Sequence, residues 1–512
     1  MAEYDLLICT RLMGETPEEM LASMEKAKEE GADIAELKLH SMHSINDVEK
    51  VIKHRLLPLI ISFSLTLSGG MCEADERKKC FEVLGLAVEL GAEFVDVELE
   101  VAAEFMSGVQ LEKHCNSKTI VSYHVKDRSS SKEKLGDLVA HMQSTRADII
   151  KLVIDSFVIT DVAKLFHLLS QCQVPLIAFA AGDRGLISQL LCRKFGGFLV
   201  YGSIGGNSIP GLPTLCSLRG VYKLEYMNAF TQIYGVISNP VGHSKGPILH
   251  NPAFRHIGYN GIYVPMCVDD IKKFFEVYSS PDFAGFSVGI PHKEAALGCC
   301  DEVDPLAKSI GAVNTIVRRP SDGKLIGYNT DCEAAITAIE DAMRARTGPN
   351  EGESHTSPLA GKLFVLVGAG GAGRALAFGA KSRGARIVIF NGNHERAKSL
   401  ASAVSGEARP YKEINSFCPE KRMILANATS VGMQPNSDKT PVSKEVLGAY
   451  DLVFDSVYTP RNTRLLREAE EAGAIAVSGV EMFIRQAIAQ FNLFTGGLAD
   501  AEFMRNIVLN QF

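Results

Sequence analysis

The chain has 512 residues, which at roughly 100–200 residues per domain predicts two to four domains and excludes a small single-purpose module. Hydrophobic residues make up 46% and charged residues 22%, a composition typical of globular chains that bury a core. The net charge of −7 leaves no basic excess to hold a phosphate backbone, so nucleic acid is not expected as a partner.

The first residues and the cysteines indicate a compartment. The start, MAEYDLLICTRL, has the features of neither a signal peptide nor a transit peptide, and the apolar runs are too short to span a bilayer. The 12 cysteines are scattered, and the adjacent pair Cys299-Cys300 lacks the spacing of a metal or redox motif. We therefore expect a cytoplasmic protein with free thiols, no membrane segment and no metal, with the plastid as the alternative if a transit segment is missing.

Short apolar runs alternate with longer amphipathic stretches up to about residue 222. The first such stretch, TPEEMLASMEKAKEEG, has apolar positions at helical spacing and ends at a glycine. Eight strand–helix units in this length predict a (β/α)8 barrel over residues 1–225, with its chemistry at the carboxyl ends of the strands. The eight runs are YDLLICTRL, ADIAELKLH, LPLIISFSL, EFVDVELE, TIVSYHV, ADIIKLVID, VPLIAFAA and GFLVYGSI.

Two polar residues in these runs are candidates for chemistry. His124 ends the fifth run, and Lys151 lies inside the sixth. A lysine inside an apolar strand has either a buried acidic partner or a lowered pKa. A desolvated amine of the second kind can attack a ketone to form a Schiff base. On the residue pattern alone, both interpretations stay open.

These segments, together with GDRG and FGGFLVYG, resemble type I 3-dehydroquinate dehydratase, a barrel enzyme that works through a Schiff base. The resemblance implies that Lys151 is the lysine that forms the imine and that His124 transfers the protons. It also implies substrate contacts for Glu36, Arg184 and Ser208.

The resemblance fails at four positions. Lys38 and Ser64 occur where the family has arginines, Ser68 where it has the glutamate that supports the histidine, and Leu212 where it has a loop glutamine. Serine cannot replace the charge and fork geometry of an arginine that binds a carboxylate. A histidine without its carboxylate loses control of its tautomer. We therefore expect the dehydratase activity to be weak or lost.

The second half of the chain begins with IYGVISNPVGHSKGPILHN and again alternates strands with helices. A polar stretch at 346–362 has the Pro, Gly and Ser content of a linker or long loop. We expect a substrate domain at 232–340, a Rossmann-type dinucleotide domain at 341–485, and a helical segment at 486–512 that returns to the substrate domain.

A glycine-rich turn follows the strand LFVLV and opens a helix, which is the context in which GxGxxG predicts dinucleotide binding. Gly368 permits the tight turn, Gly370 lets a pyrophosphate approach the backbone, and Gly373 lets the helix pack on the strand, with Gly371 between them. The phosphates are expected at the helix N-terminus, where free amides and the helix dipole favour negative charge.

The end of the next strand bears on the choice of cofactor. It reads Asn391-Gly392-Asn393, with neither the acid typical of an NAD site nor the arginine typical of an NADP site. Gly392 offers no guanidinium for a 2′-phosphate, so NAD is favoured. Arg396, one turn into the following helix, leaves NADP open.

The whole C-terminal half resembles the shikimate/quinate dehydrogenase family, and the tandem order resembles plant bifunctional dehydroquinate dehydratase–shikimate dehydrogenases. The resemblance implies that Lys293 in IPHK and Asp331 in NTD are the catalytic pair. A lysine held against an aspartate can move the hydroxyl proton of a ring alcohol while hydride passes to the nicotinamide. The further contacts that it implies are Ser244, Asn314, Asn329, Tyr458 and Gln486 for the substrate and Asn427, Thr429 and Met433 for the nicotinamide.

Two glycines suggest the substrate. Gly246 and Gly289 stand where shikimate dehydrogenases have hydroxyl side chains that hold the substrate carboxylate. Quinate carries an extra hydroxyl on a tetrahedral carbon beside that carboxylate, so it needs more room than shikimate does. Two missing side chains leave such room and remove two hydrogen-bond donors. Our hypothesis is therefore a quinate dehydrogenase that interconverts quinate and 3-dehydroquinate with NAD and carries a degenerate dehydratase barrel.

Two alternatives stay open. One is a bifunctional enzyme that dehydrates 3-dehydroquinate and reduces 3-dehydroshikimate with NADPH, which makes shikimate a further candidate substrate. The other is a regulator without catalysis that binds metabolites in the same fold. The intact Lys293, Asp331 and glycine turn argue against a regulator for the dehydrogenase half. In each case the partners are small molecules, and we expect a monomer.

Overall fold

Contacts divide the chain into two compact units. The first unit contains residues 1–233, 240–247 and 260–282, and the second contains 234–239, 248–259 and 283–512. The computed structural model describes residues 6–40, 44–65, 74–108, 116–126, 131–206, 209–242, 244–347 and 356–511. The expected domain boundaries at 225, 340 and 485 stay predictions.

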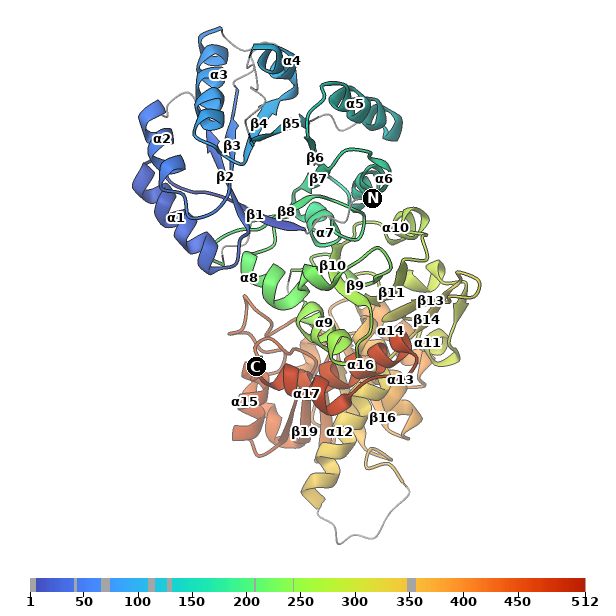
Figure 1. Ribbon diagram of the computed structural model, residues 1–512. Coiled ribbons are helices and arrows are strands. Elements are labelled where there is room, and N and C mark those ends of the chain that lie inside the picture. The colour runs from blue at the N-terminus through green and yellow to red at the C-terminus, as the bar shows by residue number, and fades with distance from the viewer. Residues whose placement is uncertain are drawn as a thin grey trace. The chain divides into compact units, whose positions relative to one another are not determined.

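The first unit contains a barrel of eight parallel strands in the order β7-β6-β5-β4-β3-β2-β1-β8 (Figure 1). The two edge strands come together beside a hydrogen bond of 3.0 Å from Phe198 N–H to Leu176 O, so the barrel is nearly closed and the predicted fold is confirmed. The strands are β1 (Leu7–Arg11), β2 (Ile34–Leu39), β3 (Leu59–Phe63), β4 (Phe94–Glu98), β5 (Lys118–Val125), β6 (Ile149–Asp155), β7 (Leu176–Ala181) and β8 (Leu199–Tyr201).

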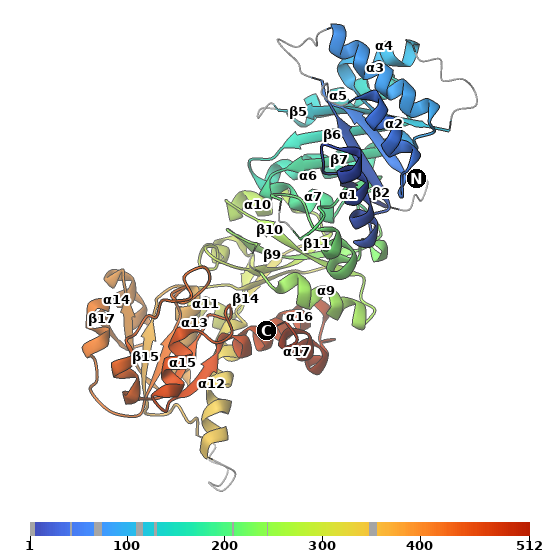
Figure 2. The ribbon, with the colours of Figure 1, turned by 90° about the vertical axis from the view of Figure 1, so that its left-hand side faces the viewer.

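Helices follow the strands and lie outside the barrel (Figure 2). The helix predicted from TPEEMLASMEKAKEEG is present as α1. Thr16 caps it in a capping box with Glu19, and Pro17 occupies its first position. The barrel helices are α1 (Pro17–Glu29), α2 (Ile45–Lys53), α3 (Ala74–Glu89), α4 (Leu99–Gly108), α5 (Lys132–Ser144), α6 (Val162–Gln171) and α7 (Leu186–Leu190), followed by the short α8 (Leu215–Ser217).

A mixed six-stranded sheet follows, in the order β10-β9-β11-β13-β14-β12. Strand β13 pairs antiparallel with β11 and with β14, and β12 pairs parallel with β14. Its strands are β9 (Gln232–Ser238), β10 (Gly261–Cys267), β11 (Phe283–Val288), β12 (Glu302–Val303), β13 (Thr315–Arg318) and β14 (Leu325–Tyr328). The helices among them are α9 (Gly246–His256), α10 (Ile271–Val277) and α11 (Pro305–Ile310).

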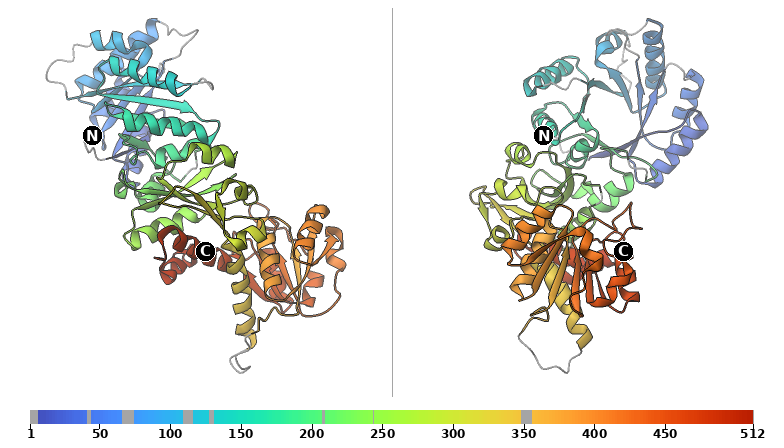
Figure 3. Two further views of the ribbon diagram at one scale, coloured as in Figure 1. Left: turned by 90° about the vertical axis from the view of Figure 1, so that its right-hand side faces the viewer. Right: turned by 180° about the vertical axis from the view of Figure 1, so that it is seen from behind.

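A second parallel sheet, drawn in orange in Figure 3, follows in the chain. Its strand order is β17-β16-β15-β18-β19-β20, which is the Rossmann order 3-2-1-4-5-6. Alternate residues of β15 belong to two hydrophobic clusters, so both faces of this sheet are buried. The strands are β15 (Leu363–Val367), β16 (Arg386–Asn391), β17 (Glu407–Pro410), β18 (Met423–Asn427), β19 (Tyr450–Asp455) and β20 (Ile475–Ser478). The helices are α13 (Gly371–Ser382), α14 (His394–Ala403) and α15 (Arg464–Glu471).

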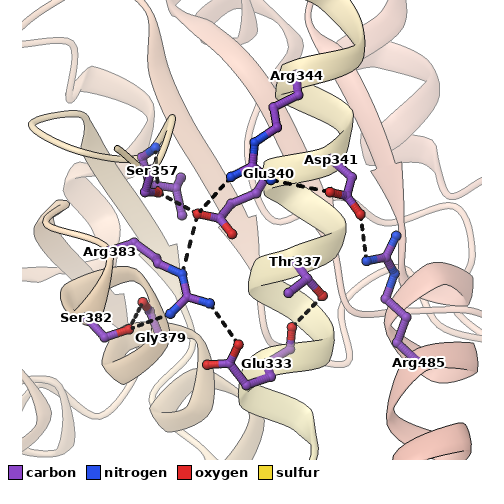
Figure 4. Close-up of polar contacts among 11 residues, drawn as sticks. Glu333, Thr337, Glu340, Asp341, Arg344, Ser357, Gly379, Ser382, Arg383 and Arg485 are labelled. Atoms are coloured by element: carbon purple, nitrogen blue, oxygen red, sulfur yellow. Dashed lines mark hydrogen bonds and ion pairs between the residues drawn. The ribbon is translucent and has the colours of Figure 1, made fainter. Parts of the chain in front are cut away.

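Helix α12 (Asp331–Thr347) is fixed to its neighbours by a polar network (Figure 4). The buried carboxylate of Glu340 accepts a hydrogen bond of 2.5 Å from Ser357 Oγ and lies 3.4 Å from Arg383 Nε. Arg383 also donates to Glu333 Oε2 at 2.8 Å. The remaining helices are α16 (Gly479–Thr495), which Arg485 joins to Asp341 of α12, and α17 (Ala501–Leu509). Over the described parts of the chain, every helix is too short or too polar to cross a membrane.

Candidate functional site

Lys151 lies inside the barrel between two acids. Its Nζ atom is 3.1 Å from Glu36 Oε1 and 3.0 Å from Asp96 Oδ2, and the three side chains are 9%, 1% and 3% exposed. Ser62 Oγ donates to the same Glu36 oxygen at 2.9 Å, and the Tyr201 ring centroid lies 5.1 Å from Nζ. Lys151 is therefore a buried ammonium group with two carboxylate partners.

The alternating direction of side chains along the strands explains why Glu36 and Lys151 lie together. Ile34, Ile60 and Ile149 belong to an apolar layer that fills the barrel. Side chains two residues apart on a strand point the same way, so Glu36 and Lys151 form the next layer toward the carboxyl ends. A third layer, at the mouth of the barrel, follows two residues later.

The pKa values follow from this geometry. Burial by itself would lower the pKa of Lys151, but Asp96 and Glu36 outweigh it and raise that pKa well above its ordinary value. Burial by itself would raise the pKa of Glu36, but the charges of Lys151 and Arg11 hold it at about 2. The sequence left two interpretations of Lys151 open, a buried acidic partner or a lowered pKa. The structure shows buried acidic partners. A Schiff base needs a neutral amine, so Lys151 must first lose a proton.

His124 lies in the layer above Lys151. In the pairing of β5 with β6, Ser122 is opposite Lys151 and His124 is opposite Val153. Its Nε2 atom is 2.9 Å from Asp155 Oδ1. The expectation that this histidine has lost its carboxylate is therefore wrong. Asp155 was not among the predicted site residues, although it ends the run ADIIKLVID, where polar residues were expected to matter.

The remaining barrel candidates lie apart from this cluster or outside the described residues. Arg184 forms a bidentate ion pair with Asp269, at 3.1 Å from Nε and 2.5 Å from Nη2, and this pairing raises the pKa of Arg184. Its expected role at the substrate stays a prediction. Ser208 and Ser68 lie outside the residues that the structure describes. Burial and the neighbouring Arg11 lower the pKa of Lys38.

Lys293 and Asp331 come together in the second unit, as predicted. Lys293 lies in the loop after β11, and Asp331 is the first residue of α12. Lys293 Nζ is 2.5 Å from Asp331 Oδ2, and the two side chains are 19% and 5% exposed. The lysine thus reaches solvent while its aspartate partner is buried, which is suited to a group that meets a substrate.

Two asparagines predicted to contact substrate fix the backbone around this pair. Asn329 Oδ1 accepts from the N–H groups of Asp331 at 3.1 Å and Cys332 at 3.2 Å. Asn314 Oδ1 accepts from Thr330 N–H at 2.8 Å, and Asn314 Nδ2 donates to Thr330 Oγ1 at 2.9 Å. Both asparagines therefore hold the segment that presents Asp331.

Helix α16 contributes two further candidates and one residue that the sequence analysis missed. Gln486 donates to Phe483 O at 3.0 Å, and the Phe483 ring packs on the ring of Tyr458 with centroids 4.9 Å apart. Gln490, one turn after Gln486, is buried, accepts from Ser287 Oγ at 2.8 Å and donates to the backbone oxygen of Asn314 at 3.1 Å. A glutamine in an otherwise apolar helix face was the signal for it.

The two predicted glycine positions are crowded. An ideal Cβ atom on Gly289 would lie 2.7 Å from Ser238 Oγ. One on Gly246, the first residue of α9, would lie 2.6 Å from Cε1 of Tyr263. Ser244 precedes that helix, and its Oγ accepts from Gly246 N–H at 3.2 Å. Neighbouring side chains therefore occupy the Cβ positions of both glycines. The room expected there for quinate stays a prediction.

The glycine turn has the geometry of a dinucleotide site. Gly368 has φ +105°, and a Cβ atom on Gly373 would lie 2.1 Å from Gly368 O, so neither position tolerates a side chain. Gly370 caps α13 and has open space where a side chain would be. Gly371 packs against Lys293, which lies 3.0 Å from an ideal Cβ. This cradle at a helix N-terminus has the geometry expected for a pyrophosphate site, and Lys293 lies beside it.

The tip of β16 is built from asparagines. Asn391 Oδ1 accepts from Ala369 N–H at 3.2 Å, and its Nδ2 donates to Asn393 O at 2.8 Å. Asn393 in turn caps α14. The guanidinium of Arg396 forms an ion pair with Glu294, the residue after Lys293. The arginine that left NADP open is therefore already held by an acid.

A buried aspartate, Asp455, contacts one of the residues expected on the nicotinamide side. Asn427, at the end of β18, donates to Asp455 Oδ1 at 2.9 Å, and Thr429 N–H and Oγ donate to Asn427 Oδ1 at 3.0 and 2.7 Å. Burial raises the pKa of Asp455 to about 6. Met433 follows on the exposed side of this loop. Asp455, the last residue of β19, was not among the residues predicted from the sequence.

Three segments match known family models. Residues 8–229 match type I 3-dehydroquinase, residues 236–316 match the shikimate dehydrogenase substrate binding domain, and residues 479–509 match the shikimate 5′-dehydrogenase C-terminal domain. Within the described residues, no group of three or more histidine, cysteine or acidic side chains is arranged to hold a metal ion.

Curated relatives and solved structures also match. The chain is 51% identical over 495 residues to the chloroplastic bifunctional 3-dehydroquinate dehydratase/shikimate dehydrogenase of Arabidopsis thaliana, covering 96% of this chain and 82% of that protein. It is 39% identical to a shikimate dehydrogenase (NADP(+)) of Pyrococcus furiosus, covering 55% of this chain and 97% of the relative. The structure of a quinate dehydrogenase from Corynebacterium glutamicum in complex with NAD is 27% identical, with a TM-score of 0.47, over 55% of this chain and 99% of that one.

Proposed function

The chain belongs to the family of bifunctional 3-dehydroquinate dehydratase/shikimate dehydrogenases, and we propose that its dehydrogenase half interconverts shikimate and 3-dehydroshikimate with a nicotinamide cofactor. We propose weak 3-dehydroquinate dehydratase activity for its barrel. The support is the likeness to the Arabidopsis relative, whose name carries both activities, over nearly the whole chain. Shikimate, the alternative in the sequence analysis, thereby becomes the first candidate.

The ion pair of Lys293 and Asp331 carries this proposal. In the direction of reduction, the Lys293 ammonium donates a proton to the ketone oxygen, and Asp331 stabilises the lysine as its charge changes. In oxidation, Lys293 accepts the proton of the ring hydroxyl. The dinucleotide, when bound, supplies or accepts the hydride. Asn329 holds the backbone of Asp331, so the carboxylate keeps its position through both directions.

For the cofactor, we propose NAD in preference to NADP. No arginine stands at the tip of β16, and Glu294 holds Arg396. A bound 2′-phosphate would have to break the ion pair between Arg396 and Glu294. It would then lie near the negative charge of Glu294, which would repel it. The names of several shikimate dehydrogenase relatives print NADP(+), so the two cofactors must be compared directly.

For the barrel, the proposal of weak activity rests on two observations. The ammonium form of Lys151 is stabilised by two carboxylates, which disfavours the neutral amine. Ser64 and Lys38 also replace two arginines of the family, and neither offers a guanidinium fork for a carboxylate. His124 keeps a carboxylate partner in Asp155, so proton transfer is supported even where substrate binding is poor.

Quinate is the second candidate substrate, because hydroxyl side chains are missing at Gly246 and Gly289. Purified full-length protein separates the two candidates when shikimate and quinate are compared with NAD and with NADP. Faster turnover of shikimate supports the first candidate, and faster turnover of quinate reverses the order. A Lys293→Met variant identifies the activity as that of this site.

Assembly and compartment are also proposals. We propose a monomer, which light scattering of the purified chain tests. The cytoplasm is the compartment expected from the sequence, and the plastid is the alternative that the name of the Arabidopsis relative prints. Microscopy of the full-length gene product with a fluorescent C-terminal tag distinguishes them.

A further inference from the structure

Ser238 occupies the place of a side chain at position 289. An ideal Cβ atom on Gly289 would lie 2.7 Å from Ser238 Oγ and 2.8 Å from Ser238 Cβ, closer than real Cβ contacts come. Gly289 does not have the positive φ that favours glycine, so its backbone conformation is open to other residues. The neighbouring serine alone therefore requires a glycine here.

The position of Ser238 is well fixed. It is the last residue of β9, and its Oγ atom donates to Ile290 O at 2.8 Å. Two backbone hydrogen bonds join the same segments, from Gly289 N–H to Ile237 O at 2.8 Å and from Asn239 N–H to Ile290 O at 2.9 Å. Ser238 cannot turn away from Gly289 without losing its hydrogen bond to the loop.

This contact belongs to the loop of the catalytic lysine. Gly289 follows β11 and precedes Lys293 in the same loop. The adjacent Val288 N–H donates to Asn314 O at 2.7 Å, and Asn314 holds Thr330 beside Asp331. Hydrogen bonds therefore connect the segment at Gly289 to the segments that carry Lys293 and Asp331. A side chain that fills the space at Gly289 lies within this hydrogen-bonded structure.

We propose that Ser238 is a specificity-determining residue of the dehydrogenase. It supplies, from β9, the bulk that the chain lacks at position 289, while its hydroxyl proton is donated to Ile290 O. Resting on the proposed function, this assigns Ser238 to the end of the pocket that meets the carboxylate-bearing carbon of the ring acid. Ser238 leaves less room for a tetrahedral carbon with an extra hydroxyl, and so favours shikimate over quinate.

The same relationship occurs at the other glycine, within the first unit. An ideal Cβ atom on Gly246 would lie 2.6 Å from Tyr263 Cε1 and 3.1 Å from the Tyr263 hydroxyl. Tyr263 is buried, so it is held in this place by its surroundings. Gly246 and Gly289 both stand where shikimate dehydrogenases have hydroxyl side chains. At both positions, a hydroxyl side chain from a neighbouring strand occupies the space.

Four variants of the full-length protein test the role of Ser238. Ser238→Gly removes the bulk, and the matched control Ser238→Ala removes only the hydroxyl. Gly289→Thr introduces the clash, and the double variant Ser238→Gly/Gly289→Thr moves the side chain from one strand to the other. The measurements are kcat/KM for shikimate and quinate and the thermal midpoint by circular dichroism.

We expect Ser238→Gly to raise the quinate-to-shikimate ratio of kcat/KM by about tenfold, and Ser238→Ala to change it much less. Gly289→Thr should lower the thermal midpoint, and the double variant should restore both the midpoint and the preference for shikimate. An unchanged ratio in a folded, active Ser238→Gly protein overturns the inference, as does a Gly289→Thr protein of normal stability. The proposed function fails by a different result, namely a wild-type protein that does not turn over shikimate.

Discussion

Arg396 of α14 forms an ion pair with Glu294, the residue that follows Lys293 in sequence. Both side chains are about half exposed, so a ligand can compete for either of them. The loop of Lys293 therefore carries the acid that holds the arginine nearest to the expected ribose site. If Lys293 acts as proposed, this ion pair connects cofactor choice to the position of its loop.

Replacing this acid should change the cofactor preference. In Glu294→Gln, Arg396 is free to bind a 2′-phosphate, and we expect the NADP-to-NAD ratio of kcat/KM to rise by about tenfold. Gly392→Arg should act in the same direction by adding a guanidinium at the tip of β16. The control is Glu395→Gln. Glu395 is an exposed acid on α14, the helix of Arg396, and it pairs with Lys398. If the NADP-to-NAD ratio rises equally in Glu395→Gln and Glu294→Gln, the loss of any negative charge, and not the ion pair with Arg396, is responsible.

The raised pKa of Lys151 predicts how imine formation depends on pH. The neutral amine becomes more abundant as the pH rises, so trapping of 3-dehydroquinate on Lys151 by borohydride should be faster at pH 9 than at pH 7. Asp96→Asn removes one of the carboxylates that raise this pKa, and should speed trapping at pH 7. Mass spectrometry of the trapped lysine measures both effects.

The control for this experiment is Asp137→Asn, an exposed acid on α5. Trapping that is slower in a folded Asp96→Asn protein than in the control would mean that Asp96 assists the reaction itself. Trapping with no pH dependence would contradict the assignment of Lys151 as a protonated group.

Glu36 predicts acid lability of the barrel. Its folded pKa of about 2 lies below the ordinary value of 4.5, so the unfolded chain binds the proton first as the pH falls. The resulting stabilisation is present above about pH 4.5 and is lost between about pH 4.5 and 2, with a size of about 3 kcal/mol. Glu36→Gln should flatten this part of the unfolding curve followed by far-ultraviolet circular dichroism. An unchanged acid midpoint in that variant would contradict the pairing with Lys151.

The network on α12 predicts a coupling between stability and activity. Glu340→Ala removes the buried acceptor that Ser357, Arg383 and Arg344 share, and should destabilise the second unit by about 1–3 kcal/mol. Because Asp331 begins the same helix, kcat should also fall. The exposed side chain of Glu333 accepts from the other end of Arg383 and provides the milder variant Glu333→Ala. An equal loss in both variants would show that Glu340 has no special role.

Local features of the sequence were predicted well. The turn at Gly368–Gly373 requires glycines for reasons of local sterics, and the alternation of runs predicts both the barrel and the Rossmann sheet. Lys293 and Asp331 were identified by resemblance, and the structure brings them together.

Partners that are distant in sequence could not be predicted. Glu36 and Asp96 lie 115 and 55 residues from Lys151, and only the register of the barrel strands joins them. Ser238 ends one strand and Gly289 follows another, so their contact depends on the sheet. The sequence shows which side chain is missing at a position, but not which neighbour fills its place. That is why the side chains next to the two glycines were not predicted.

The most direct measurement of the central claim is a side-by-side assay of the purified full-length protein with shikimate and with quinate, each with NAD and NADP. The Lys293–Asp331 pair and the filled space at Gly289 predict a kcat/KM for shikimate at least about tenfold above that for quinate. The Lys293→Met protein should lose about a hundredfold or more of this activity. A kcat/KM that is higher for quinate than for shikimate would contradict the claim.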